Sequence, residues 1–254
     1  MVLIAILIGL AVGILVGFLG IGGGIVLVPS LTLLLGFSQQ VAQGTSLFMQ
    51  LPPLGLGALL LYWRRGLVDT WAGAVCALGI FGGGYFGSRV AIAVSSRELQ
   101  GLFGAFLLAA AASLWREPRK KGLASIEPGG WARLALVFVV ACGVGVLSGL
   151  FGVGGGILLV PLLVVVLGFE QHVAQGTSLV ALVPPTGLLA FLNYQRAGMV
   201  QWKVGLLIMP GIFLGGLIGS RLAVRFAPRE MRRIFAVVLL PICVWQFISA
   251  LLRH

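Results

Sequence analysis

The chain contains one sequence pattern twice, in register and without a gap. The stretch that begins at Gly17 recurs from Gly149, an offset of 132 residues. Polar residues keep the same offset, so that Gln43, Gly44, Thr45, Ser46, Tyr62 and Arg64 match Gln175, Gly176, Thr177, Ser178, Tyr194 and Arg196. Two apolar sequences that resembled each other by chance would not keep their polar residues aligned. We therefore predict two copies of one structural unit.

Each copy consists of five apolar segments separated by short polar or glycine-containing breaks. The segments cover about 2–19, 22–36, 43–63, 67–93 and 98–115 in the first copy, and about 131–151, 154–168, 175–195, 199–225 and 230–252 in the second. Crossing a bilayer takes about 20 helical residues. Only 9% of the residues are charged, whereas soluble domains keep roughly a quarter. These features predict an all-α polytopic membrane protein.

The first two segments of each copy are expected to form a broken or re-entrant helical pair, because the second is short and follows a glycine break. Each copy then crosses the membrane an odd number of times, which inverts the second copy relative to the first. We assign residues 1–118 to the first membrane repeat, 119–130 to a basic cytoplasmic linker and 131–254 to the second membrane repeat.

The distribution of basic residues favours the inverted arrangement. Basic residues gather on the cytoplasmic side of membrane proteins, and two clusters lie within 116–121 and 225–233. Inversion places both clusters in the cytoplasm and leaves both termini outside. The net charge of +11 therefore reports topology, and we expect the lipid bilayer as a partner and no nucleic acid.

The glycine runs that interrupt each copy are the first candidate for a binding site. A helix that starts after such a run presents unpaired N–H groups and the positive end of its dipole, which attract anions. Broken helices from two inverted repeats often meet near the middle of the membrane to bind a substrate. The alternative is that these glycines only permit close helix packing.

The second candidate is the polar motif that opens the third segment of each copy. Its amide and hydroxyl groups can donate hydrogen bonds to an oxyanion, and the alternative role of Thr or Ser there is to cap the helix. The substrate-binding residues predicted from both motifs are Gly22, Gly23, Gly24, Gln43, Thr45, Ser46, Gly154, Gly155, Gly156, Gln175, Thr177 and Ser178. The paired prolines that follow, at 52–53 and 184–185, predict a kink or an unwound turn.

The acidic residues all lie near segment ends or in connections, and none lies deep in an apolar run. Carriers coupled to cations or protons often keep a carboxylate at that depth, so we expect an anionic substrate. We also expect no enzymatic activity, no cofactor and no metal site, because the sequence has no acid dyad, zinc motif or nucleophile–base pair.

The duplicated Gly-Ile-Gly-Gly-Gly-Ile…Val-Pro pattern, the Ala-Gln-Gly-Thr-Ser motif and the later Tyr…Arg…Gly-Leu-Val-Asp resemble the sulfite-exporter (TauE/SafE) family of bacterial membrane proteins. The resemblance covers essentially the whole chain. It implies export of sulfite, an organosulfonate or a related small anion across the bacterial inner membrane. The acidic position of the family is kept as Asp69, but its equivalent in the second copy is Gln201. Alternative functions are a passive anion channel or a non-transporting membrane scaffold.

Overall fold

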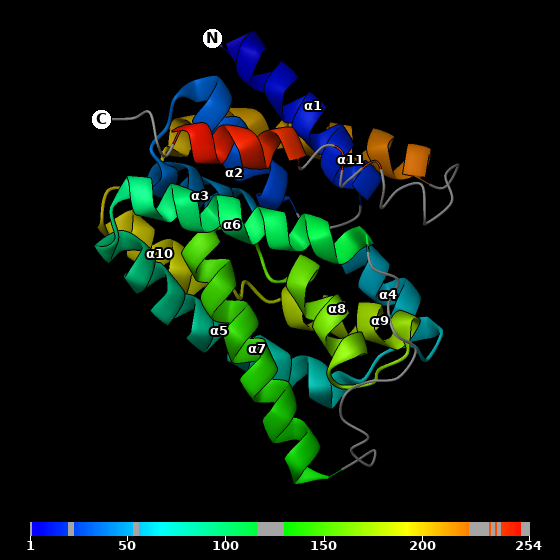
Figure 1. Ribbon diagram of the computed structural model, residues 1–254. Helices are drawn as coiled ribbons and strands as arrows, with labels where there is room; N and C mark the ends of the chain where they lie inside the picture. Colours follow the sequence, from blue (N-terminus) through cyan, green and yellow to red (C-terminus); the bar gives the residue numbers. More distant parts are fainter. Residues whose placement is uncertain are drawn as a thin grey trace.

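The structure is a computed structural model, and it describes residues 2–19, 23–52, 56–115, 130–223, 234, 237 and 240–249. This described part is helical and contains no strand. Its helices are α1 (Val2–Leu19), α2 (Gly24–Leu35), α3 (Gln39–Met49), α4 (Leu56–Arg64), α5 (Thr70–Ala93), α6 (Ser96–Trp115), α7 (Trp131–Phe151), α8 (Gly156–Val165), α9 (Gln171–Leu182), α10 (Leu188–Arg196) and α11 (Trp202–Ala223) (Figure 1). A further apolar helix covers Leu240–Ser249.

The helix interruption predicted at the glycine motifs is present. In the second copy α7 ends at Phe151 and α8 begins at Gly156, and in the first copy α1 and α2 are likewise separate helices. The basic linker lies almost wholly outside the described residues, which resume at Gly130.

Each third segment consists of two helices, and of the two alternatives predicted at the paired prolines, a kink or an unwound turn, the second copy shows the unwound turn. In the second copy α9 ends at Leu182 and α10 begins at Leu188, with Pro184 and Pro185 between them. Proline has no N–H to donate and disfavours helix in the residue before it, so two in succession separate the helices. In the first copy α3 ends three residues before Pro52.

Close packing of α1 along α11 recurs between their counterparts in the other copy, α7 and α5. Glycines line both contacts, because small residues let helix backbones approach each other within lipid. A methyl group on Gly13 would lie 2.7 Å from Cα of Ile212, and one on the equivalent Gly145 would lie 2.7 Å from Cα of Ile80. The facing glycines are Gly9, Gly13 and Gly17 on α1, Gly211, Gly215 and Gly219 on α11, Gly145 and Gly149 on α7, and Gly79, Gly83 and Gly87 on α5.

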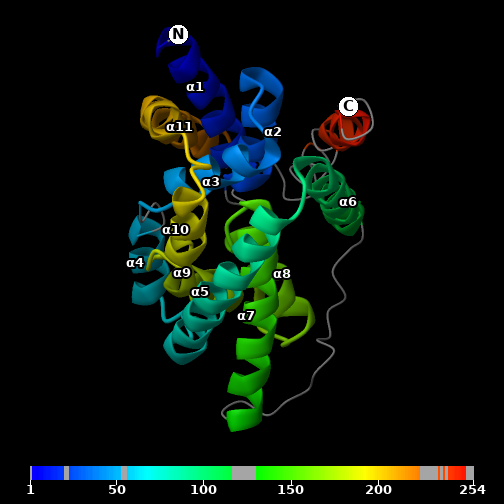
Figure 2. The same ribbon diagram turned by 90° about the vertical axis from the view of Figure 1, so that its left-hand side faces the viewer.

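These two helix pairs hold the copies together, since each pair takes one helix from each copy. In Figure 1 the α1–α11 pair lies at the top and the α5–α7 pair below it, while α4 and its counterpart α10 lie at opposite edges. Figure 2 shows α6 and the helix at Leu240–Ser249 side by side, away from α4 and α10.

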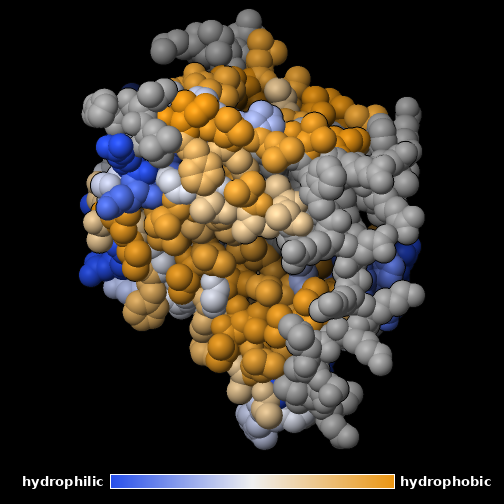
Figure 3. Space-filling view, viewed as in Figure 1, coloured by the Kyte–Doolittle hydropathy of each residue, from blue (hydrophilic) through white to orange (hydrophobic). Residues whose placement is uncertain are grey.

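The surface of the molecule is that of a membrane protein. Among the described residues, α5, α7 and the stretch Trp202–Gly219 of α11 are long and apolar enough to cross a membrane. Figure 3 shows apolar side chains across the middle of one face and hydrophilic ones near two opposite edges. Trp71 and Trp131, at the starts of α5 and α7, are 78% and 89% exposed, as suits aromatic residues at a membrane–water interface.

Adjacent glycines on α5 test the importance of the close contact. A methyl group on Gly83 would meet the Cys142 carbonyl of α7, whereas one on Gly82 would meet no atom of the described residues within 4 Å. We expect Gly83→Ala to lower the free energy of unfolding by about 1–3 kcal/mol, as overpacking does. Gly82→Ala should leave it unchanged or raise it, because alanine favours helix. Thermal unfolding in detergent would measure both, and equal effects would contradict the packing argument.

Candidate functional site

A polar stripe runs along one face of α3. It consists of Gln39, Gln43, Ser46 and Gln50, whose spacings of three and four residues place them on the same side of a helix. The sequence placed the start of this segment at Gln43, but α3 begins four residues earlier, where the Ser38 side chain accepts a hydrogen bond from the Val41 N–H. The alternative capping role for the Thr and Ser residues is therefore wrong, since they lie inside the helix.

The stripe faces the glycine break of the second copy. Ser46 Oγ donates to the Gly152 carbonyl over 2.9 Å, and Gln50 Nε2 donates to the same oxygen over 3.2 Å. Gly152 has a φ of 66° and Gly154 a φ of 74°, a left-handed conformation that favours glycine. Both hydrogen bonds join α3 of the first copy to the backbone freed by the end of α7.

The helix α2, which follows the glycine run of the first copy, starts against the break of the second copy. A methyl group on Gly24, the first residue of α2, would lie against Cα of Val153 and 2.5 Å from the Gly152 carbonyl oxygen. Val153 lies within the break between α7 and α8. The start of α2 therefore touches the break of the other copy.

The helices that start at the two breaks have no side-chain caps. The N-cap residues are Gly23 for α2 and Gly155 for α8, and neither can offer a side-chain acceptor. The first N–H groups of a helix have no partner within the helix, and its N-terminus carries a partial positive charge. The start of α2 lies against the break at Gly152–Val153, and it favours a negative ligand there.

The amide of Gln43 is the most distinctive polar group at the junction. Its side chain is fully buried, and a methyl group on Gly152 would lie 2.7 Å from its Cα. Its Oε1 accepts a hydrogen bond of 2.9 Å from the hydroxyl of Tyr194. Its Nε2 finds no hydrogen-bond partner among the described residues. A buried donor without a partner is rare in folded proteins and is most readily explained by a ligand or water.

Tyr194 belongs to a set of hydrogen bonds between the copies that occurs twice. The Tyr62 hydroxyl donates to Gln175 Oε1 over 2.9 Å, as the equivalent Tyr194 does to Gln43. The common offset of 132 residues predicts that the two tyrosines are equivalent, but it gives them no role. The signal that could have found the role was the strict pairing of Tyr with Gln at the same offset.

The threonines make the second duplicated hydrogen bond. The Asp69 N–H donates to Thr177 Oγ1 and the Gln201 N–H donates to Thr45 Oγ1, both over 3.0 Å. Both hydroxyls therefore hold the loop before a long helix of the other copy. At Asp69 and Gln201 both repeats use the backbone N–H as the donor. This hydrogen bond does not need a carboxylate, so Gln201 can replace the acidic residue.

The structure brings together only some of the residues predicted for the site. Gly24, Gln43 and Ser46 meet the break at Gly152–Gly154. Methyl groups on Gly155 and Gly156 would instead meet the Leu182 side chain. The remaining predicted residues are either bonded elsewhere or not placed at this junction. Thr45 bonds the Gln201 N–H, Gln175 and Thr177 bond Tyr62 and Asp69, and Ser178 bonds the Gln175 carbonyl. Gly23 lies in the turn before α2, and Gly22 lies outside the described residues.

The described acidic residues lie at helix starts. Asp69 caps α5 by accepting from the Ala72 N–H over 3.0 Å, and its other oxygen lies 3.6 Å from Arg133 at the start of α7. Glu98 lies in the first turn of α6 and Glu170 at the N-cap of α9. In this described part no three His, Cys, Asp or Glu residues form a metal-binding group.

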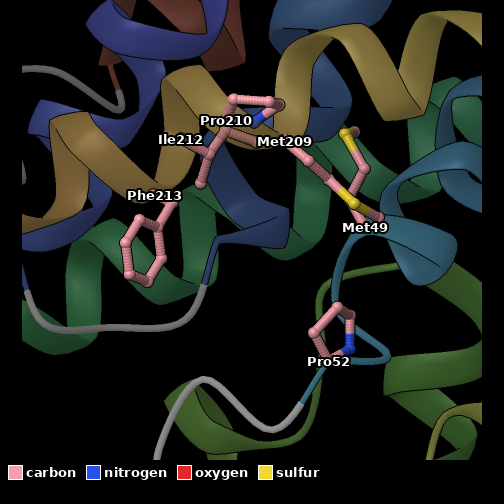
Figure 4. Close-up of a pocket in the computed structure, with 6 residues that line it drawn as sticks. All are labelled: Met49, Pro52, Met209, Pro210, Ile212 and Phe213. Atoms are coloured by element: carbon pink, nitrogen blue, oxygen red, sulfur yellow. The ribbon is translucent and has the colours of Figure 1, made fainter.

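An apolar pocket of about 270 Å³ lies beside the polar stripe (Figure 4). Met49 and Pro52 line it from the α3–α4 break, and the opposite wall comes from α11 around Pro210. Its other lining residues are Met209, Ile212 and Phe213, so it offers no side-chain donor to an anion. The candidate anion site is the junction of the glycine breaks and not this pocket.

Comparison with known proteins agrees with this architecture. A sequence model of the family described as Sulfite exporter TauE/SafE matches residues 5–245. The chain belongs to this family. Its relatives include the probable membrane transporter protein YunE of Bacillus subtilis (strain 168), 30% identical over 93% of this chain and 94% of that protein. No solved structure matches the chain.

A second relative extends the comparison to an archaeon. The probable membrane transporter protein MJ0441 of Methanocaldococcus jannaschii is 27% identical over 92% of this chain and 91% of its own length. Another, from Xylella fastidiosa (strain 9a5c), is 29% identical over 92% and 90%. These relatives carry the names of membrane transporters, and together with the family match and the apolar helices they identify this chain as a membrane transporter.

The two equivalent tyrosines provide a test of the hydrogen bonds between the copies. Tyr194 and Gln43 are both fully buried, whereas Tyr62 and Gln175 are half-buried. We expect Tyr194→Phe to lower the free energy of unfolding by about 1–3 kcal/mol, because it leaves a buried amide oxygen without its donor. Tyr62→Phe should have a smaller effect, since water reaches its partner. Thermal unfolding in detergent measures both, and a larger loss for Tyr62→Phe would contradict this assignment.

Proposed function

We propose that this transporter exports a small sulfur-containing oxyanion, such as sulfite or an organosulfonate, across the bacterial inner membrane by alternating access. The proposed site is the junction where the α3 stripe of Gln43, Ser46 and Gln50 meets the break at Gly152–Gly154 and the start of α2. The family name supports a sulfur oxyanion as the substrate.

The observation that carries the proposal is the unpartnered Nε2 of Gln43 at this junction. Amide and backbone N–H groups can hydrogen-bond an oxyanion without the large desolvation cost of a buried charge. Tyr194 binds Oε1 of the amide, so the NH₂ group is the end left for a ligand. The uncapped start of α2 adds a positive dipole end beside the break.

We further infer that the repeats are inverted. The support is that α1 packs on α11 as α7 packs on α5, and that the equivalent helices α4 and α10 lie at opposite edges of the molecule (Figure 1). An inverted pair can exchange conformations between its halves, which opens a central site to one side and then to the other.

Burial of the junction favours a carrier over a passive channel. Gln43 and Ser46 are fully buried, whereas a passive channel would need a continuous wet pathway past them. A non-transporting scaffold would not need the buried, unpartnered Nε2 of Gln43 at this contact.

Binding measurements test the site directly. We expect sulfite, thiosulfate or a short sulfonate to raise the melting temperature of the purified protein. Gln43→Leu should weaken that binding about tenfold or more, because it removes a hydrogen bond to a charged group. The matched control is Gln195→Leu, on an exposed position of α10, which should bind normally. Normal binding by a folded Gln43→Leu protein would contradict the proposed site.

The energy source follows from the position of the carboxylates. The described acidic residues lie at helix starts, away from the junction, so we propose export without a coupled cation. An anion leaving an inside-negative cell gains about 2.3 kcal/mol per charge for each 100 mV. In proteoliposomes loaded with sulfite, an inside-negative potential should accelerate efflux, and the opposite potential should slow it. Efflux that ignores the potential would contradict this mechanism.

A further inference from the structure

Three more buried glutamines have side-chain atoms without partners. Gln39, Gln100 and Gln246 are 1%, 3% and 0% exposed. Nε2 of all three, and Oε1 of Gln39 and Gln246, find no hydrogen-bond partner among the described residues. None of these atoms is used by the junction described above.

The three glutamines lie along one face of α6. Gln100 belongs to that helix, whereas Gln39 on α3 and Gln246 on the helix Leu240–Ser249 lie beside it. The Gln39 N–H donates to Ser96 Oγ over 3.0 Å at the start of that helix. Gln100 follows one turn later and Gly104 one turn after that, on the same side of the helix. A methyl group on Gly104 would lie 3.4 Å from Cβ of Gln246, on the helix that packs beside α6 (Figure 2).

Leaving such groups unpaired is unfavourable. A buried donor or acceptor without a partner destabilises a protein by about 1–3 kcal/mol, and lipid cannot relieve this as water can. Packing alone would be served better by leucine at these positions. The amides therefore point to polar occupants, either water or a solute that water accompanies.

The arrangement also connects the junction with the surface. Gln39 is the first member of the α3 stripe that leads through Gln43 and Ser46 to Gln50 at the glycine break. The other end of the path lies at the start of α6, where Ser95 and Glu98 are exposed. In the inverted arrangement this end faces outward.

We propose that Gln39, Gln100 and Gln246 line a hydrated vestibule through which the anion passes from the junction to the outer surface. The proposal rests on the proposed function and adds the exit path to it. The free N–H groups of the amides replace part of the water around the anion, and the amide oxygens bind the water that accompanies it. The vestibule conducts the anion, while the junction determines its affinity.

Measuring transport and binding in the same variants distinguishes the conducting role of the vestibule from the binding role of the junction. Sulfite efflux from proteoliposomes and sulfite binding in detergent would be measured for Gln100→Leu and Gln246→Leu, with Gln195→Leu as the control. We expect both vestibule variants to slow efflux about tenfold, the effect of losing one hydrogen bond to a charged group, and to keep the sulfite Kd within about twofold of the original. Normal efflux by both variants would overturn the vestibule.

The same data distinguish failure of the vestibule from failure of the proposed function. If Gln43→Leu also binds sulfite normally, the junction is wrong, whatever the vestibule variants do. If Gln100→Leu and Gln246→Leu lose sulfite binding as completely as Gln43→Leu, the separation of path and site is wrong. Melting temperatures of all variants verify that they are folded.

Access of water provides a second test that does not require transport. In a protein with Cys76, Cys142 and Cys243 replaced by serine, Gln246→Cys should react with a membrane-impermeant anionic thiol reagent. The control is Leu163→Cys, at a fully buried apolar position of α8, which should not react. A short sulfonate, which does not consume the reagent as sulfite would, should slow the reaction at position 246. A thiol at position 246 that is as unreactive as the control would overturn the hydrated vestibule.

Discussion

A helix that ends inside a membrane must have its free backbone groups satisfied by the protein, because lipid offers no hydrogen bonds. This chain interrupts helices at the glycine motifs and again at the proline pairs. At the break after α7 the partners come from the other copy, since Ser46 and Gln50 both donate to the Gly152 carbonyl. The polar face of α3 is therefore needed for folding as well as for the proposed binding, and this double role explains why amide and hydroxyl groups lie so deep in an apolar protein.

Glycine packing determines which breaks can meet. Because α1 lies directly on α11 and α7 on α5, each long helix pairs with the other copy, and the copies interlock. The start of α2 then touches Val153, and the Tyr–Gln and Thr–backbone hydrogen bonds occur once in each direction between the copies. A single side-chain stripe in an isolated copy would have no such partners. The proposed site depends on these contacts between the two copies.

The common offset predicted more of this structure than any local motif did. It predicted that both copies would break at the same places, and α7 has the bounds expected for it. The sequence could not place the start of α3, because Ser38 and Gln39 look like part of a polar connection until Ser96 and α6 are known to pack on them. It also could not show that Gln50 reaches the Gly152 carbonyl, a hydrogen bond that the equivalent Leu182 cannot make. The contacts that decide these two features join residues 57 and 102 positions apart, and periodicity within a segment carries no information about them.

The claim on which the account depends is that an oxyanion binds where the two glycine breaks meet. Selenite is the selenium analogue of sulfite, and selenium scatters X-rays anomalously. The most direct measurement is an anomalous difference map from crystals of the protein grown with selenite. The account predicts a peak within hydrogen-bonding distance of Gln43 Nε2, beside the break at Gly152–Gly154. A peak found elsewhere, with none at this junction, would contradict it.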